Sequence, residues 1–164
     1  MPERKTIERA RGDRRQGKSP STQAGEFVRE EMDHIREGKH GARSAKQAIA
    51  IGLSKARRAG VVLQAPAGTA AAKTRATAKR DLAAGAASRH KVSRKRSLAI
   101  TAALEREGDA AASHRALAAH ATKSARQRGS AERSAAARKA AKTRAKSKRA
   151  TVATRSTKSR THSA

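Results

Sequence analysis

The sequence is poor in the residues that build a large hydrophobic core. Of its 164 residues, one is Phe and none is Tyr or Trp, and Val, Ile, Leu and Phe together number only 17. Most of its apolar residues are alanines. Because each ordered residue costs about 1.5 kcal/mol of conformational entropy, methyl groups alone do not stabilise a large globular enzyme. We therefore expect no catalytic residues, no cofactor and no small-molecule substrate.

Other absences narrow the class of protein further. Cysteine is absent, which excludes disulfides and thiolate metal sites. The longest apolar run, residues 48–53, is far shorter than the ~20 residues of a membrane span, so we expect no membrane partner. None of the six histidines forms an i, i+4 pair with a nearby carboxylate set, and we expect no metal site. No apolar segment follows the N-terminus, so we expect no secretory signal, and the absence of cysteine fits a cytoplasmic protein. The DNA binding predicted below places it at the nucleoid.

What the chain does have is positive charge, and this charge is unevenly placed. The formal net charge is +27, of which residues 1–38 carry +1 and residues 39–164 carry +26. The last acidic residue is Glu132. A nearly neutral head followed by a polycationic body is the pattern expected of a chain that coats a polyanion.

The head contains a predicted helix at residues 21–37. Ser19 followed by Pro20 is typical of a helix start, and Gly38 is typical of a helix end. Between them, apolar residues recur at helical spacing: Ala24, Phe27, Val28, Met32 and Ile35. The opposite face is acidic and carries Glu26, Glu30, Asp33 and Glu37.

A second helix is predicted at residues 44–59. Ser44 and Gln47 form a capping-box pattern, and Gly60 ends the helix. Its apolar face comprises Ala45, Ala48, Ile49, Gly52, Leu53, Ala56 and Ala59. The two helices carry net charges of −3 and +4, which favours an antiparallel hairpin, and Gly52 permits close approach. We expect this marginal hairpin to be stabilised by self-association with a second copy of the chain or by docking another protein.

The sequence of the second predicted helix is similar to a motif of a known protein family. Its sequence, Lys46-Gln-Ala-Ile-Ala-Ile-Gly-Leu-Ser-Lys-Ala-Arg-Arg-Ala-Gly60, resembles a family of small, basic, uncharacterised bacterial and phage proteins that share a KQAIAIALSxARxAG helix. The chain departs from this motif at Gly52, where the family has Ala. The resemblance covers about 35 residues around this helix and implies a bacterial origin. Members are often labelled DNA-binding, and the resemblance carries over no catalytic residues.

The remainder of the chain is predicted to be a tail of Ala/Lys/Arg-rich helical or disordered segments. Gly85, Gly108 and Gly129 divide it, and only residues 97–107 have enough apolar side chain to dock. Residues 71–80 and 140–149 match at 8 of 10 positions. The predicted fold class is therefore mainly α, without a β-sheet. Its three parts are a basic arm (1–18), the helical hairpin (19–63) and the polycationic tail (64–164).

The tail is similar in composition to the tails of linker histones and of histone-like bacterial nucleoid proteins, but it lacks their prolines after Pro66. This similarity and the charge predict binding of duplex DNA through phosphates, without base specificity. The predicted contacts are Lys46, Arg57, Arg58, Lys73, Arg75, Lys79, Arg80, Lys91, Arg94, Lys95, Arg96, Arg138, Lys139, Lys142, Arg144, Lys146, Lys148 and Arg149.

Two alternatives stay open at the level of sequence. The chain could be an RNA- or ribosome-associated basic protein, because RNA phosphates attract the same cations. It could also be a protein-interaction module in which the hairpin binds a partner and the tail only localises it.

Overall fold

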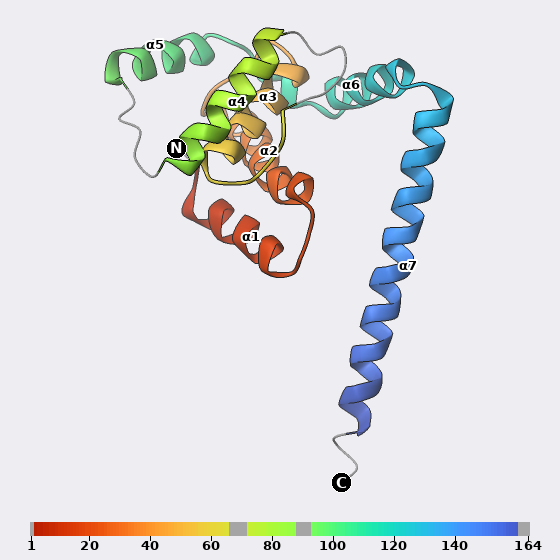
Figure 1. Cartoon of the computed structure of the whole chain (residues 1–164). Coiled ribbons are helices and arrows are strands. Elements are labelled where there is room, and N and C mark those ends of the chain that lie inside the picture. The colour runs from red at the N-terminus through yellow and green to blue at the C-terminus, as the bar shows by residue number, and fades with distance from the viewer. Residues whose placement is uncertain (1, 66–71, 88–92, 161–164) are drawn as a thin grey trace. The chain divides into compact units, whose positions relative to one another are not determined.

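The computed structural model of the chain describes residues 2–65, 72–87 and 93–160, with side chains as far as residue 145. Within these ranges it has seven α-helices, one short 3-10 helix and no β-strand (Figure 1), which confirms the prediction of a mainly α protein. The structure divides into two compact units, residues 1–120 and residues 121–164.

The predicted hairpin forms the centre of the N-terminal unit. Its helices are α2 (Pro20–Arg36) and α3 (Ala45–Arg58), each within one residue of its predicted bounds. Both predicted caps are present, because the side chains of Ser19 and Ser44 accept hydrogen bonds from backbone N–H groups in the first turn. The residues that follow the helices adopt left-handed backbone conformations at Gly38 and Gly60, with φ of 72° and 89°.

Two small clusters of apolar side chains hold this unit together. One cluster lies between α2, the start of α3 and the 3-10 helix, and contains Met32, Ile35, Ala42, Ala48, Ala111 and Ala112. The other lies between α1 (Arg4–Arg15), α2 and the end of α3, and contains Ala10, Ala24, Phe27, Ala56 and Val61. The predicted apolar faces of the hairpin are therefore covered by other segments of the same chain.

The first eighteen residues are not a separate basic arm. They contain helix α1 (Arg4–Arg15), which packs on α2 and buries Ala10. Arg9 Nε lies 2.8 Å from Oε2 of Glu26, and the backbone N–H of Glu3 donates to Glu30 Oε1 over 3.1 Å. The acidic face of α2 is thus partly covered by α1, whose Arg9 side chain and Glu3 backbone N–H contact two of its carboxylates.

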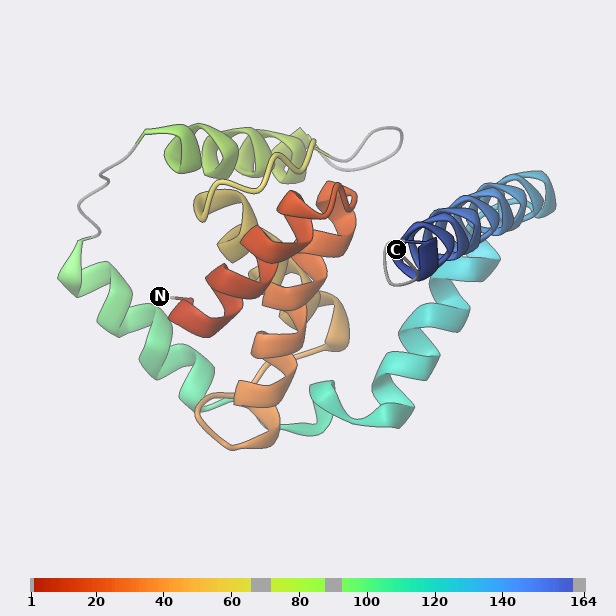
Figure 2. The ribbon, with the colours of Figure 1, turned by 90° about the horizontal axis from the view of Figure 1, so that it is seen from below.

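Part of the predicted tail also belongs to the N-terminal unit. Helix α4 (Ala72–Ala86) packs on α3, as Figure 2 shows. Gly85 does not divide the tail as predicted. It lies within α4, where a Cβ would collide with the backbone carbonyl of Arg57. The prediction that this segment lacks the means to dock is wrong, because Ala78, Asp81 and Gly85 supply a small contact surface.

Helix α5 (Arg94–Glu105) behaves in the opposite way. It buries none of its side chains, and Leu98 and Ile100 are 61% and 55% exposed. The segment that we expected to dock is attached mainly at its end, where the backbone N–H of Gly41 donates to Leu104 O over 2.9 Å. The 3-10 helix (Ala110–Ala112) then buries two alanines against the hairpin.

Helix α6 (His114–Gln127) begins in the N-terminal unit and ends in the C-terminal one. After Gly129 the C-terminal unit continues as helix α7 (Ser130–Arg160), the longest of the chain with 31 residues. Gly108 and Gly129 lie between helices, as predicted. The described residues of the C-terminal unit are therefore the end of α6 and the single long helix α7.

Candidate nucleic-acid interface

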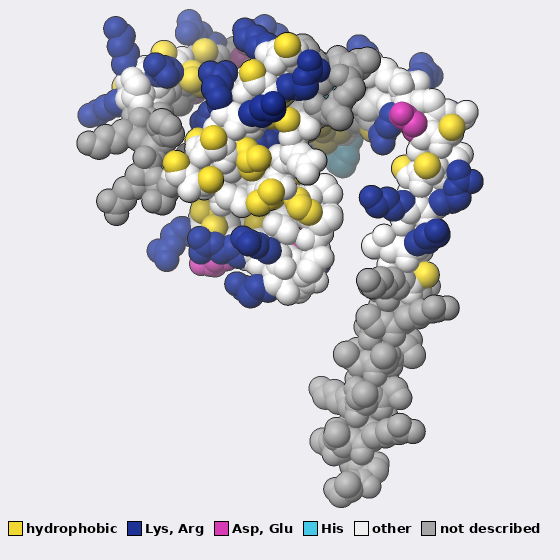
Figure 3. Space-filling model, in the orientation of Figure 1, with side chains coloured by type: hydrophobic (Ala, Val, Ile, Leu, Met, Phe, Trp, Pro, Cys, Tyr) yellow, Lys and Arg dark blue, Asp and Glu magenta, His cyan; other side chains and the backbone are white. Residues whose placement is uncertain are grey.

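Helix α7 presents the predicted contacts of the C-terminal unit. It is rich in Ala, Lys and Arg, which are strong helix formers, and contains a single acidic residue, Glu132. Four of its predicted contact residues have described side chains: Arg138, Lys139, Lys142 and Arg144. All four are exposed, and no carboxylate among the described residues pairs with them. Figure 3 shows Lys and Arg side chains projecting from the described part of this helix.

These cations do not form one stripe. Successive residues of an α-helix are rotated by about 100°, so Arg138, Lys139 and Arg144 lie on three different faces of α7. At a rise of ~1.5 Å per residue, the 31 residues extend over about 46 Å. The helix can therefore present cations to polyanionic groups on more than one of its sides.

Helices α4 and α5 carry the next group of predicted contacts. The side chains of Lys73, Lys79 and Arg80 on α4 are exposed, and Arg75 is partly buried. The first turn of α5 exposes three consecutive cations, Arg94, Lys95 and Arg96. Lys91 lies outside the described residues, as do the side chains of Lys146, Lys148 and Arg149.

The predicted contacts on α3 differ from one another. Lys46 is exposed. Arg57 is only 8% exposed, and its Nε donates to Leu63 O over 3.1 Å. Arg58 Nε lies 2.8 Å from Asp81 Oδ1 on α4. The prediction is therefore wrong for Arg57, whose guanidinium holds the segment after α3, and Arg58 already has a carboxylate partner.

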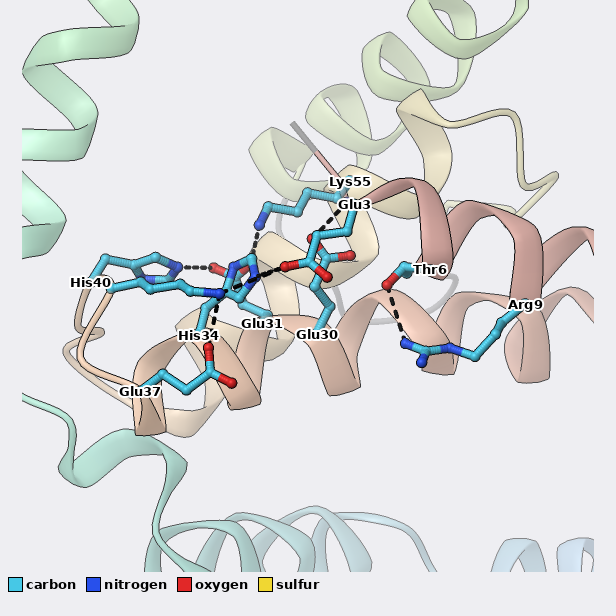
Figure 4. A network of polar contacts seen from close by, with 10 residues as sticks. Glu3, Thr6, Arg9, Glu30, Glu31, His34, Glu37, His40 and Lys55 are labelled. Atoms are coloured by element: carbon cyan, nitrogen blue, oxygen red, sulfur yellow. Dashed lines mark hydrogen bonds and ion pairs between the residues drawn. The ribbon is translucent and has the colours of Figure 1, made fainter.

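A second group of charged side chains surrounds the end of α2 (Figure 4). Glu31 is buried, and its carboxylate contacts the Lys55 ammonium group on α3 and the imidazole Nε2 of His40 in the loop after α2. Nε2 of His34 lies 3.0 Å from Glu3 Oε1. One oxygen atom of Glu31 and one ring nitrogen of each of the two histidines lie within 4.8 Å of one another.

The electrostatics at the edge of this group are set by Glu3. The hydrogen bond with His34, together with the charge of Lys39, lowers the pKa of the Glu3 carboxyl. The pKa of Lys39 is raised, first by its hydrogen bond to Glu37 and then by the nearby charges of Glu37 and Glu3. Both groups are therefore held in their charged forms.

Sequence reasoning missed this second group. A metal site on one helix is expected from histidines four residues apart, whereas His34 and His40 are six apart and meet because the chain reverses after Gly38. The signal that could have found it is the i, i+3 spacing of Glu31 and His34, which places both on one face of α2.

None of the described helices is both long and apolar enough to cross a membrane. Comparison of the chain with protein-family models, with curated proteins and with solved structures finds no match. The resemblance of the α3 sequence to a bacterial and phage family stays a prediction.

Proposed function

We propose that this protein binds duplex DNA through its phosphates, without reading base sequence, as a linker-histone-like nucleoid protein that compacts or protects DNA. The observation that carries this proposal is the exposed set of cations on α7, which has no carboxylate partner among the described residues. Residues 121–164 contain fourteen basic residues and one acidic residue. A unit of this charge is strongly attracted to any polyanion.

Counterion release supplies the free energy of binding. Duplex DNA carries about one negative charge per 1.7 Å and a layer of condensed cations, which Lys and Arg displace. The major groove is about 12 Å wide and admits an α-helix. A helix with cations on several faces can contact phosphates on both walls of such a groove.

The described side chains of α7 include no Asn or Gln, which read adenine, and no aromatic residue, which could stack on bases. Phe27 is the only aromatic residue of the chain and is 1% exposed, so it does not stack on bases. The exposed residues of α7 are chiefly Lys, Arg and small residues, which contact phosphates. Phosphate contacts position a protein on DNA but carry no sequence information.

The N-terminal unit contributes less to binding in this proposal. Its carboxylates pair with several of its own cations, including Arg9 and Arg58. The apolar faces that we expected to join two copies pack within the chain, with Phe27 and Ile35 at most 1% exposed. A homodimer would therefore need a different surface from the predicted one.

The proposal is tested by titrating the full chain into a labelled DNA duplex at several salt concentrations. One variant replaces Arg138, Lys139, Lys142 and Arg144 by Gln. The matched control loses the same charge from exposed positions of α1, by replacing Arg4, Lys5, Arg11 and Arg14 by Gln. Each phosphate contact contributes about −0.9 to the slope of log K against log salt. The slope of the α7 variant should therefore be shallower than that of the unaltered chain by up to about 3.6.

The control variant should bind DNA much more like the unaltered chain than the α7 variant does. Equal losses in the two variants would show that net charge, not α7, determines binding. The same titration with duplex RNA of equal length separates the alternatives. Tenfold tighter binding of RNA would favour the RNA-associated function, and absence of binding to both would favour a protein-interaction module.

A further inference from the structure

The side chains of Glu31, His34 and His40 converge at the end of α2 (Figure 4). Glu31 and His34 lie on one face of α2, and His40 reaches them from the loop that leads to α3. The rings of the two histidines are nearly perpendicular, with centroids 6.0 Å apart. Each histidine side chain is 14% exposed, so the cluster remains accessible from solvent.

Glu31 is the buried member of the cluster. Its side chain is 1% exposed, and burial of a carboxylate is costly unless it is paired and hydrogen-bonded. Its oxygens contact the Lys55 ammonium group and Nε2 of His40, but neither contact has the geometry of a hydrogen bond. The buried carboxylate thus has only two polar contacts and is chemically suited to bind a further cation.

The orientation of His40 adds an independent observation. Nδ1 of His40 lies 3.2 Å from the carbonyl oxygen of Gly41, which can only accept a hydrogen bond, so Nδ1 carries a proton. In the neutral ring this leaves a lone pair on Nε2, which lies 3.3 Å from Glu31 Oε1. A lone pair and a carboxylate oxygen facing each other at this distance repel unless a proton or a metal ion lies between them, so Nε2 is placed to act either as a donor to Glu31 or as a metal ligand.

His34 is held in a corresponding way. Its Nε2 donates to Glu3 Oε1 over 3.0 Å, which leaves Nδ1 as the basic nitrogen of the neutral ring. No other described side chain hydrogen-bonds this ring. A carboxylate that accepts from the second nitrogen of an imidazole is the usual partner of a metal-bound histidine, since it fixes the ring and raises its basicity.

We propose that Glu31, His34 and His40 form a binding site for a first-row divalent transition metal ion, with zinc as the representative. Two imidazoles and one carboxylate are a ligand set that suits Zn²⁺ and is less suited to Ca²⁺ or Mg²⁺, which prefer oxygen. Lys55 is the competitor, because its ammonium group contacts the same carboxylate. The ion would displace this contact.

Such a site would link helix and loop. The loop that carries His40 also supplies the backbone N–H groups of Gly41 and Ala42, which donate to Leu104 O and Gly108 O. An ion bound by α2 and this loop would therefore stabilise the attachment of the segment between α5 and the 3-10 helix. This consequence is independent of DNA binding by α7.

The test uses the full chain, stripped of metal by a chelator and titrated with Zn²⁺ in a calorimeter. His34→Gln and His40→Gln should each weaken binding at least tenfold. The matched control is the double variant His114→Gln, His120→Gln, which removes two histidines of α6 and should bind as the unaltered chain does. Absence of saturable binding by the unaltered chain, or equal binding by the His34 and His40 variants, would overturn the proposal.

A second variant separates metal binding from a merely structural ion-pair cluster. Lys55→Met removes the competing cation and leaves a buried carboxylate, so Zn²⁺ should bind at least threefold more tightly and should raise the melting temperature more than in the unaltered chain. If the cluster is only a network of ion pairs, Lys55→Met destabilises the fold and Zn²⁺ restores nothing. Circular dichroism at 222 nm checks that each variant is folded.

Discussion

Asp81 illustrates how this basic chain uses one of its few acidic side chains. Only five of the thirteen acidic residues follow residue 38, and Asp81 is buried on α4 with 4% exposure. It accepts a hydrogen bond from the hydroxyl group of Ser54 and pairs with Arg58, both on α3. A single carboxylate thus joins two helices that would otherwise contact each other mainly through alanines and a glycine.

We expect Asp81→Ala to lower the free energy of unfolding of the full chain by about 1–3 kcal/mol, because the Ser54 hydroxyl loses its acceptor. The ion pair adds little, since Arg58 is largely exposed. Urea unfolding followed by circular dichroism measures the change. Glu132→Ala removes the same charge from an exposed position and should change stability by no more than about 0.5 kcal/mol. Equal effects would contradict the assigned role.

Two glycines in helix interiors should respond in opposite directions to the same substitution. A Cβ on Gly52 would lie 2.7 Å from the Cα of Val28, so Gly52→Ala forces α2 and α3 apart and should destabilise by about 1–3 kcal/mol. A Cβ on Gly25 would meet no atom from another part of the chain within 4 Å, so Gly25→Ala should stabilise the protein by about 0.5–1 kcal/mol. Thermal unfolding of both variants checks this, and stabilisation by Gly52→Ala would refute the close approach.

At the scale of elements, the hairpin was predictable because its signals are local. Ser19, Gly38 and Ser44 act on the turn next to them, and the apolar spacing of α2 defines its buried face without knowledge of the partner. What covers that face is a nonlocal property. The packing of α1 depends on Arg9 meeting Glu26, a pairing that no periodicity in either helix specifies.

The two copies of the internal repeat also show that local sequence predicts a helix but not its packing. Residues 71–80 and 140–149 are nearly identical and both lie largely in helices, yet the first copy docks on α3 and the described residues of the second are exposed. The difference lies mostly just beyond the repeat, where α4 continues with Asp81 and Gly85 and α7 has Ala150 and Thr154 at the corresponding positions. Helical propensity predicts the helix, and a carboxylate and a glycine decide whether it packs.

Helix α7 should act on DNA as a continuous helix. Ala141→Pro interrupts α7 in its middle, because Pro lacks the N–H group and clashes with the preceding turn. DNA binding should weaken several-fold, because the cations on either side of the break are no longer held at fixed distances from one another. The control, Ala131→Pro, lies in the first turn, where Pro is tolerated. Fluorescence anisotropy with a labelled duplex measures both variants, and circular dichroism confirms the loss of helix. Unchanged binding by Ala141→Pro would mean that an unstructured run of cations suffices.

For the whole molecule, charge density distinguishes the two units more sharply than net charge does. Residues 1–120 carry 26 basic and 12 acidic residues, whereas residues 121–164 carry 14 basic and 1 acidic. The net charges of +14 and +13 are similar, but the second is concentrated on about a third as many residues. From composition alone we placed the start of the polycationic tail at residue 64, because composition does not reveal that α4 and the 3-10 helix pack on the hairpin.

Removing residues 130–164 should separate binding from folding. If about 8 phosphates are neutralised by the full chain, the slope of log K against log salt is about −7, and the truncated chain should have a markedly shallower slope and at least tenfold weaker affinity near physiological salt. Its melting transition should stay close to that of the full chain, because both apolar clusters lie within residues 7–117. Retention of the full slope by the truncated chain would assign DNA binding to the N-terminal unit and would exclude α7 as the principal contact.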